Sequence, residues 1–359
     1  MFKNHFHLYR LHRLYLSIKV SFIGKFLSIS HIFLSGVKKM DTRKVQITGK
    51  STYVVTLPKK WALRSKLEAG SHISIFYQED GSLLLKPPGI KTFKKMKKIK
   101  FNKELEHIKR DLVGLYIISD YQTIEIVGDD IPAAARREIK DLCHRLVGLE
   151  MVEGDEKKII IKNFLDTEDF TIEKGLKRMS SLVYLMLDEL ASVFEENDKE
   201  LCSHIISRDD DLDRMFLLVS KQHVERLNLK KPSKHDNLSL VESFYYRLAA
   251  NDIERIGDHI SKISLHFSYI TLPQEVLAIL VDLCRECQSL FMDSTEALRE
   301  SNSDIANNVL GREDIFNKML INAAQLQTGE SIELIIDSFS RIKDYASNIA
   351  ESAIDLSQL

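Results

Sequence analysis

Carboxylate side chains spaced one helical turn apart are the residues of this chain best suited to chemistry. Between Arg247 and His266 the sequence reads RLAANDIERIGDHISKISLH, and in a helix Asn251, Glu254 and Asp258 fall on one face. The opposite face is apolar and consists of Ala249, Ile253, Ile256, Ile260 and Ile263. The spacing therefore predicts a helix that packs with one side and offers oxygen atoms as metal ligands on the other.

An imperfect copy of this segment near the C-terminus makes it an internal repeat. The copy reads SFSRIKDYASNIAE and aligns Asp344 with Asp258. Asp337 precedes Asp344 on the same predicted helix face. Both halves of the repeat are therefore candidate metal sites.

Asp209 and Asp213, four residues apart within RDDDLDR, add a third acidic helix face. Carboxylates stacked in this way repel one another, and a bound cation relieves the repulsion. Oxygen ligands without clustered His or Cys suit divalent ions such as Mg²⁺, Mn²⁺ or Ca²⁺, or iron, rather than structural zinc. The alternative is that these acids form only the solvated face of amphipathic helices. His259, beside the acids, is expected to pack or cap rather than to bind metal.

Composition indicates a soluble, globular, helix-rich protein, since 29 % of the 359 residues are charged and 44 % are hydrophobic. Four cysteines are too few for a disulfide framework and suit a reducing cytoplasm. Cys284 and Cys287 form a lone CxxC within a helical pattern, and we expect them to pack rather than to bind metal or do redox chemistry. A hydrolytic enzyme is disfavoured, because no nucleophile, phosphate-binding loop or placed general base accompanies the carboxylates.

Charge is strongly polarised along the chain. Residues 41–103 hold 15 basic and 4 acidic side chains, whereas residues 104–359 hold 29 basic and 48 acidic ones. A basic head suggests contact with a polyanion, and an acidic body suits solubility or cation binding. Residues 91–103, KTFKKMKKIKFNK, contain seven lysines and no acid. Two interpretations of this segment stay open, a solvated basic linker and a set of phosphate contacts.

Residues 1–39 are basic and rich in Phe, Leu and His. No apolar run reaches the roughly 20 residues that span a bilayer, and no signal-peptide cleavage site follows. We expect a non-native or disordered extension that results from translation assigned too far upstream, and starting at Met40 should leave the folded structure intact. The alternative is a basic amphipathic membrane anchor.

Residues 40–90 show the period of two that is typical of short strands, in KVQITGK, STYVVTLP, SHISIFYQ and GSLLLKP. Pro58 is expected to begin a short helix, and Gly49, Gly70 and Gly81 are expected to form turns. So small a unit has few apolar positions for a core of its own, and we expect it to dimerise. Residues 104–168 alternate helix and strand and predict a small α/β domain.

After residue 168 the pattern is helical. The breaks predict six helices, at about 170–196, 198–228, 238–268, 273–300, 303–325 and 329–357. They form two sets of three in the same order, and each set ends in a carboxylate-bearing helix. The predicted architecture of this part is a pair of three-helix bundles, residues 169–270 and 271–359.

The motif NDIERIGDH, residues 251–259, and its imperfect repeat resemble the E/DxxxD signature of the PhoU family of phosphate-uptake regulators. The resemblance covers roughly residues 170–359. It implies two three-helix bundles whose paired motifs hold multinuclear iron or other divalent cations. By this resemblance Glu254 and Asp258 match both acids of the first motif.

The second motif departs from the family pattern. Asp344 matches its second acid, but Ser340 stands where its first acid belongs. One ligand is therefore missing from the second site, unless Asp337 or Glu351 substitutes for it.

The segments RKVQITGKSTYVVTLPKKWA and LEAGSHISIFYQEDGSLLLKP resemble an AbrB-type (SpoVT/AbrB) swapped-hairpin domain. In that family two chains interleave their strands and present basic residues to DNA, and an extra residue or two at Ser51 and Thr52 departs from the pattern. The resemblance implies phosphate contacts by a set of basic side chains, namely Arg43, Lys44, Lys50, Lys59, Lys60 and Arg64. The alternative is a β dimerisation module that does not bind DNA.

An AbrB-like head joined to PhoU-like bundles is similar to a group of archaeal phosphate-uptake regulators. The combination implies a cytoplasmic homodimer whose head binds promoter DNA and whose bundles bind divalent or iron cations and report phosphate status. The alternative is an adaptor that docks on a phosphate transporter or sensor kinase, with a head that serves only for dimerisation. No stable membrane insertion is expected in either case.

Overall fold

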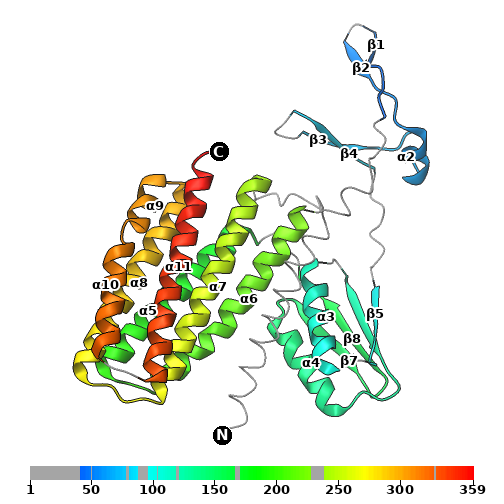
Figure 1. The fold of residues 1–359 in the computed structure, drawn as a ribbon. Helices are drawn as coiled ribbons and strands as arrows, with labels where there is room; N and C mark the ends of the chain where they lie inside the picture. The colour runs from blue at the N-terminus through cyan, green and yellow to red at the C-terminus, as the bar shows by residue number, and fades with distance from the viewer. Residues whose placement is uncertain are drawn as a thin grey trace. The chain divides into compact units, whose positions relative to one another are not determined.

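The computed structural model describes residues 41–49, 51–77, 81–87, 96–102, 104–118, 121–165, 170–227, 238–326 and 329–359. The expected extension of residues 1–39 and Lys50 lie outside these ranges. The described residues divide into two units, one of those from 41 to 97 with 104–110, and the other of those in 98–102 and from 111 to 359. A small β head, an α/β domain and an all-α region follow one another along the chain, as the sequence predicts (Figure 1).

Two antiparallel hairpins and a short helix form the head. Strand β1 (Gln46–Thr48) pairs with β2 (Thr52–Val54), and β3 (Ser74–Tyr77) pairs with β4 (Leu83–Lys86). Gly49, in the first turn, has a φ of +67°, which lies in the left-handed region that favours glycine. Helix α2 (Lys59–Arg64) begins directly after Pro58, as expected.

The head has no core of its own, because none of its described residues between 41 and 87 is buried. One face of the second hairpin is apolar, since Ile75 lies opposite Leu85 and Tyr77 lies opposite Leu83. Tyr77 is 86 % exposed and Ile75 is 52 % exposed. The other exposed large hydrophobic residues of the head are Val45, Ile47, Tyr53, Val54, Val55, Leu63 and Leu83. So much apolar surface on a small unit indicates an interaction face.

A four-stranded sheet and two helices form the α/β domain. The strand order is β5 (Met96–Lys100), β6 (Thr123–Val127), β8 (Lys158–Asn163) and β7 (Leu149–Gly154). The helices are α3 (Leu105–Ile118) and α4 (Ala133–Arg145). Four isoleucines on one face of the two central strands are buried, namely Ile124, Ile126, Ile159 and Ile161. Together with the apolar faces of the helices they give this domain its core.

Part of the lysine-rich segment 91–103 is not a linker, because Met96–Lys100 forms the edge strand β5. Ile99 is buried, and its neighbour Lys98 places Nζ 2.8 Å from Glu125 Oε2. Lys158 Nζ lies 3.4 Å from the other oxygen of Glu125. The hydrogen bond from Lys98 is the main cause that lowers the pKa of Glu125 below its ordinary value. A single buried isoleucine among lysines was too weak a signal to predict a strand.

Two sets of helices form the all-α region. The first set is α5 (Ile172–Glu196), α6 (Leu201–Leu227) and α7 (Leu240–Ser268). The second is α8 (Gln274–Glu300), α9 (Ser303–Leu310), α10 (Glu313–Leu326) and α11 (Glu330–Leu356). Helix α7 packs against both α6 and α11, while α5 packs against α8 (Figure 1). The ring of Phe194 lies 5.0 Å from that of Phe267 and 6.3 Å from that of Phe339, which joins helices of both sets in one core.

The fifth predicted helix, 303–325, is in fact two helices separated at Gly311 and Arg312. Glycine is a poor helix former, which favours a break at Gly311. The side chain of Arg312 in addition binds residues of α8. Its guanidinium donates to Asp293 Oδ2 at 2.8 Å and to Ser289 Oγ at 3.0 Å. Within the described ranges, no helix combines the length and apolar character needed to cross a membrane.

Candidate metal centre

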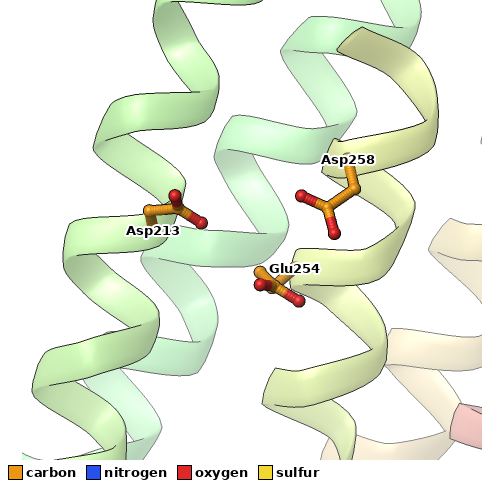
Figure 2. Close-up of side chains that lie close together, drawn as sticks. All are labelled: Asp213, Glu254 and Asp258. Carbon is orange, nitrogen blue, oxygen red and sulfur yellow. The ribbon is translucent and has the colours of Figure 1, made fainter. Parts of the chain in front are cut away.

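Three carboxylates from two neighbouring helices converge in the first half of the all-α region. Helix α6 contributes Asp213 and α7 contributes Glu254 and Asp258, and Figure 2 shows the three side chains in the space between the two helices. One oxygen atom of each lies within 4.8 Å of those of the other two. Among the residues that the structure describes, this is the one group of three or more Asp, Glu, His or Cys side chains at such spacing.

Close packing of α6 and α7 at Gly257 brings these acids together. A Cβ atom at this position would lie 2.2 Å from Leu212 Cδ2 and 3.3 Å from Asp209 Oδ1. Any side chain would therefore force the two helices or their side chains apart. The opposite side of α7 is fixed in the core by three fully buried residues, Ile253, Ile256 and Ile260. The predicted apolar face therefore lies in the core, but the acidic face also packs, against α6, and Glu254 is buried there.

Asp209 lies one turn before Asp213 on α6 and belongs to the same acidic region. Its Oδ1 atom and the hydroxyl of Ser261 are both buried, and Ser261 lies close enough to Asp209 for a hydrogen bond that favours the charged carboxylate. Burial raises the pKa of Asp209 well above its ordinary value, and the charges of Asp258 and Glu254 raise it further. These two oxygens are further donors, beside the three carboxylates, of the kind that a hard cation binds.

The electrostatics of the group favour the same conclusion. Burial raises the pKa of Asp213 well above its ordinary value, and Asp209, Glu254 and Asp258 add to the effect. Glu254 is only 1 % exposed. Ionised carboxylates that share a buried space are costly unless a positive charge joins them. With oxygen atoms as the donors, the residues fit Mg²⁺, Mn²⁺, Ca²⁺ or iron.

Two neighbours of this group have different surroundings. Asn251 is half-buried one turn before Glu254 on α7, and its amide oxygen remains a candidate ligand. The ring of His259 lies 5.8 Å from that of Tyr345 on α11. Burial is the main cause that lowers the pKa of His259 to about 4. These contacts support a packing role for the histidine.

The candidates on α11 do not join the three-carboxylate group. Asp337 lies near enough to His259 to favour its charged form. Asp344 is engaged by cations of its own helix, since its Oδ1 lies 2.9 Å from Lys343 Nζ and its Oδ2 lies 3.6 Å from Arg341 Nη1. The sequence pattern aligns Asp344 with Asp258, but it does not predict the contact between Asp344 and Lys343.

The cysteines offer no second site. All four are buried and free, and Cys284 Sγ donates to the backbone oxygen of Leu187 at 3.1 Å. Burial raises the pKa of both Cys284 and Cys287, so neither forms a reactive thiolate at neutral pH. The CxxC motif is therefore part of the core.

We expect a thiol reagent such as Ellman's reagent to modify none of the four cysteines of the folded protein within minutes. All four should react in denaturant, because unfolding exposes them. The absorbance of the released thiolate measures both states. Fast modification of two thiols in the native protein would show instead that the CxxC pair is accessible.

The basic residues predicted to contact DNA lie on the head. Arg43, Lys44, Lys59, Lys60 and Arg64 are all exposed, and Lys50 lies outside the described residues. Arg43 makes a 3.5 Å ion pair with its neighbour Asp41. Three of these basic residues, Lys59, Lys60 and Arg64, lie on the short helix α2.

Comparison with protein families identifies two parts of the chain. The family described as PhoU domain matches residues 176–266, which include every acid of the three-carboxylate group. The chain contains a PhoU domain. The family described as antidote-toxin recognition MazE, bacterial antitoxin, matches residues 46–93, which confirms the resemblance of the head to AbrB-type domains.

Two relatives and one solved structure are similar to parts of this chain. A phosphate-specific transport system accessory protein PhoU homolog from Clostridium acetobutylicum is 23 % identical over 199 residues, covering 52 % of this chain and 90 % of the relative. PhoU homolog 1 from Thermotoga maritima is 29 % identical over 109 residues, covering 30 % of this chain and 44 % of the relative. The crystal structure of PhoU from Pseudomonas aeruginosa matches with a TM-score of 0.45 at 19 % identity, over 54 % of this chain and 98 % of that one.

Sequence reasoning missed two contributors to the geometry around the acids. Gly257 permits the close approach of α6, and Ser261 places a buried hydroxyl beside Asp209. A glycine inside an otherwise regular helical pattern was the available signal for the first, since it costs helix stability and needs a packing reason. The position of Ser261 beside Asp209 could not be predicted, because the sequence pattern does not show that α6 packs against α7.

Proposed function

We propose that this protein is a cytoplasmic, metal-binding regulator of phosphate uptake that acts on DNA through its head. The observation that carries the proposal is the convergence of Asp213, Glu254 and Asp258 inside the PhoU domain. Asp209 and the hydroxyl of Ser261 supply further oxygens beside them. These residues would hold one or more divalent or iron cations, whose charge would offset that of the carboxylates.

The phosphate-related part of the proposal is supported by the relatives. Both are named accessory proteins of a phosphate-specific transport system. We propose the same kind of role here, with no catalytic step. A component of a phosphate transporter or of a phosphate-sensing kinase would then be a protein partner.

The DNA-binding part is supported by the head. It matches a MazE-type domain and exposes Arg43, Lys44, Lys59, Lys60 and Arg64. Its uncovered apolar faces support pairing of two chains, which would double the number of basic residues on one surface. Duplex DNA is the polyanion proposed for this surface.

Charge reversal on α2 tests DNA binding. We expect Lys59→Glu with Lys60→Glu to weaken binding of the full chain to promoter DNA by at least about tenfold at low salt. Affinity of the wild type should fall with salt with a slope of about −0.9 per phosphate contacted, and the variant should have a shallower slope. Fluorescence anisotropy of labelled duplexes across a salt series measures both.

The matched control is Lys140→Glu with Lys318→Glu, which makes the same charge change on exposed positions of α4 and α10. It should leave the affinity nearly unchanged. Absence of binding by the wild type at about 50 mM salt would favour the adaptor function, in which the head only pairs chains. Equal loss in both variants would mean that net charge, and not the head, determines binding.

A further inference from the structure

The two halves of the all-α region carry the same motif but differ at one residue next to the acids. The motif reads RIGD at residues 255–258 of α7 and RIKD at residues 341–344 of α11. Gly257 of the first half therefore corresponds to Lys343 of the second. Ile256 and Ile342 are both fully buried, so the motifs face their cores in the same way.

Lys343 is a buried lysine between two carboxylates. Its Nζ lies 2.9 Å from Asp344 Oδ1 and 3.0 Å from Glu313 Oε1 at the start of α10, and its side chain is only 9 % exposed. A lysine is ordinarily charged at neutral pH, and two carboxylates at hydrogen-bonding distance favour the charged form. The amine is therefore a charged ammonium at neutral pH.

The first half has the opposite arrangement. Gly257 brings no side chain, and a Cβ atom there would already collide with Leu212. Four acids gather around that position, namely Asp209, Asp213, Glu254 and Asp258. In the second half, Ser340 stands at the position of Glu254, so an acid is lost where a lysine is gained. Compared with the first half, the second half therefore has one oxygen donor fewer and a positively charged side chain of its own.

We propose that the ammonium of Lys343 takes the place of a second metal centre, so that each chain binds metal only in its first half. The paired metal sites that the PhoU resemblance implies do not fit the second half, because an ammonium already bridges Asp344 and Glu313 and would repel a dication. The assignment of metal to the first half rests on the proposed function. The role of Lys343 does not, because it follows from its own contacts.

Thermal unfolding of the full chain tests the role of Lys343 by itself. Lys343→Met replaces the lysine with an apolar side chain of similar length. We expect Tm to fall by several degrees, because Glu313 loses its cation and Asp344 keeps only Arg341, 3.6 Å away. Adding Asp344→Asn should restore part of the loss. The exposed Lys318→Met on α10 is the control and should leave Tm unchanged. An unchanged or higher Tm for Lys343→Met, as a hydrophobic replacement of an ion pair can give, would overturn the role of the ammonium.

Metal content tests the consequence, with Mn²⁺ as the probe and elemental analysis after dialysis as the measurement. Ser340→Glu alone should bind no more Mn²⁺ than the wild type, because Lys343 remains between the acids. Ser340→Glu with Lys343→Gly, which copies the first half, should bind up to about twofold more. A gain with Ser340→Glu alone, or no gain with the double variant, would count against exclusion of metal by the lysine.

The two proposals fail in different ways. If the wild type binds no Mn²⁺, the proposed metal centre of the first half is wrong, and the Tm of Lys343→Met still decides the role of the lysine. If the wild type binds Mn²⁺ and keeps half of it after Glu254→Gln with Asp258→Asn, the second half binds metal and the inference is wrong.

Discussion

Glu254→Gln with Asp258→Asn is expected to remove most of the bound metal from the protein while its helical content stays unchanged. Both side chains belong to the three-carboxylate group, and neither lies on the face of α7 that Ile253 and Ile256 anchor in the core. Replacing two of the charged donors leaves too few anionic oxygens for a hard divalent cation. Elemental analysis of the dialysed full chain and circular dichroism measure the two effects.

The control for this variant is Glu275→Gln with Asp282→Asn, two exposed acids of α8. It makes the same change in net charge and should keep the wild-type metal content. Wild-type protein without metal, or a double variant with an unchanged metal content, would mean that the acids form only a solvated and partly buried face. Loss of helicity in the variant would instead show that the acids are needed for folding.

Once metal is removed by chelation, the variant Glu254→Gln with Asp258→Asn should be more stable to unfolding than the wild type. In the metal-free wild type the pKa values of Asp209 and Asp213 are raised by burial and by neighbouring carboxylates. A carboxyl whose pKa is raised by folding stabilises the fold when protonated, so its contribution is lost as pH rises through the folded-state pKa. With two neighbouring charges removed, the variant should depend less on pH and exceed the chelated wild type in stability by about 1 kcal/mol.

Ile75→Asp is expected to separate the paired heads and to abolish DNA binding at concentrations where the wild type binds. Ile75 lies on the apolar face of the β3–β4 hairpin and is half exposed in the single chain, so a carboxylate there removes little packing within one chain. In a pair of heads this face would be covered, and a buried carboxylate costs several kcal/mol. Self-association should weaken by about 100-fold or more. Analytical ultracentrifugation over a range of concentrations measures it.

Ser74→Asp is the matched control, because Ser74 precedes Ile75 on the same strand and its side chain points to the other face. It should leave the association intact. A wild type that stays monomeric at all accessible concentrations, or an Ile75→Asp variant that associates as tightly as the wild type, would show that the apolar face is not the surface that joins two chains.

Local patterns predicted most elements because the decisive signals lie within a few residues of one another. Ser239 and Glu242 form the capping box that starts α7. In the head, Gly49 lies in a turn and Pro58 directly precedes α2, both as expected. The break at Gly311 was predictable in principle, but the apolar period continues across it. Strand β5 was not predicted, since the charge of its lysines hides the single apolar residue that packs.

The candidate site was predictable as a list of residues but not as a geometry. Helical spacing places Glu254 and Asp258 together, and it places Asp209 and Asp213 together, yet only the packing of α6 on α7 joins the two pairs. The same limit applies to the second half. Lys343 binds Glu313 across thirty positions of sequence, and no local pattern encodes such a contact.

None of the described head residues is buried, whereas the all-α region has a core. The folded fractions of these two parts should therefore depend differently on protein concentration. The all-α region encloses its own core, so its folded fraction does not depend on how much protein is present. Under the proposed pairing, folding of the head is a second-order reaction, and its folded fraction rises with the number of chains in the cell. Two chains held on adjacent sites of one DNA molecule would replace bulk concentration by a much higher local one. The level of expression itself would then set a threshold for the DNA-bound state, while the metal-binding region stays folded on either side of it.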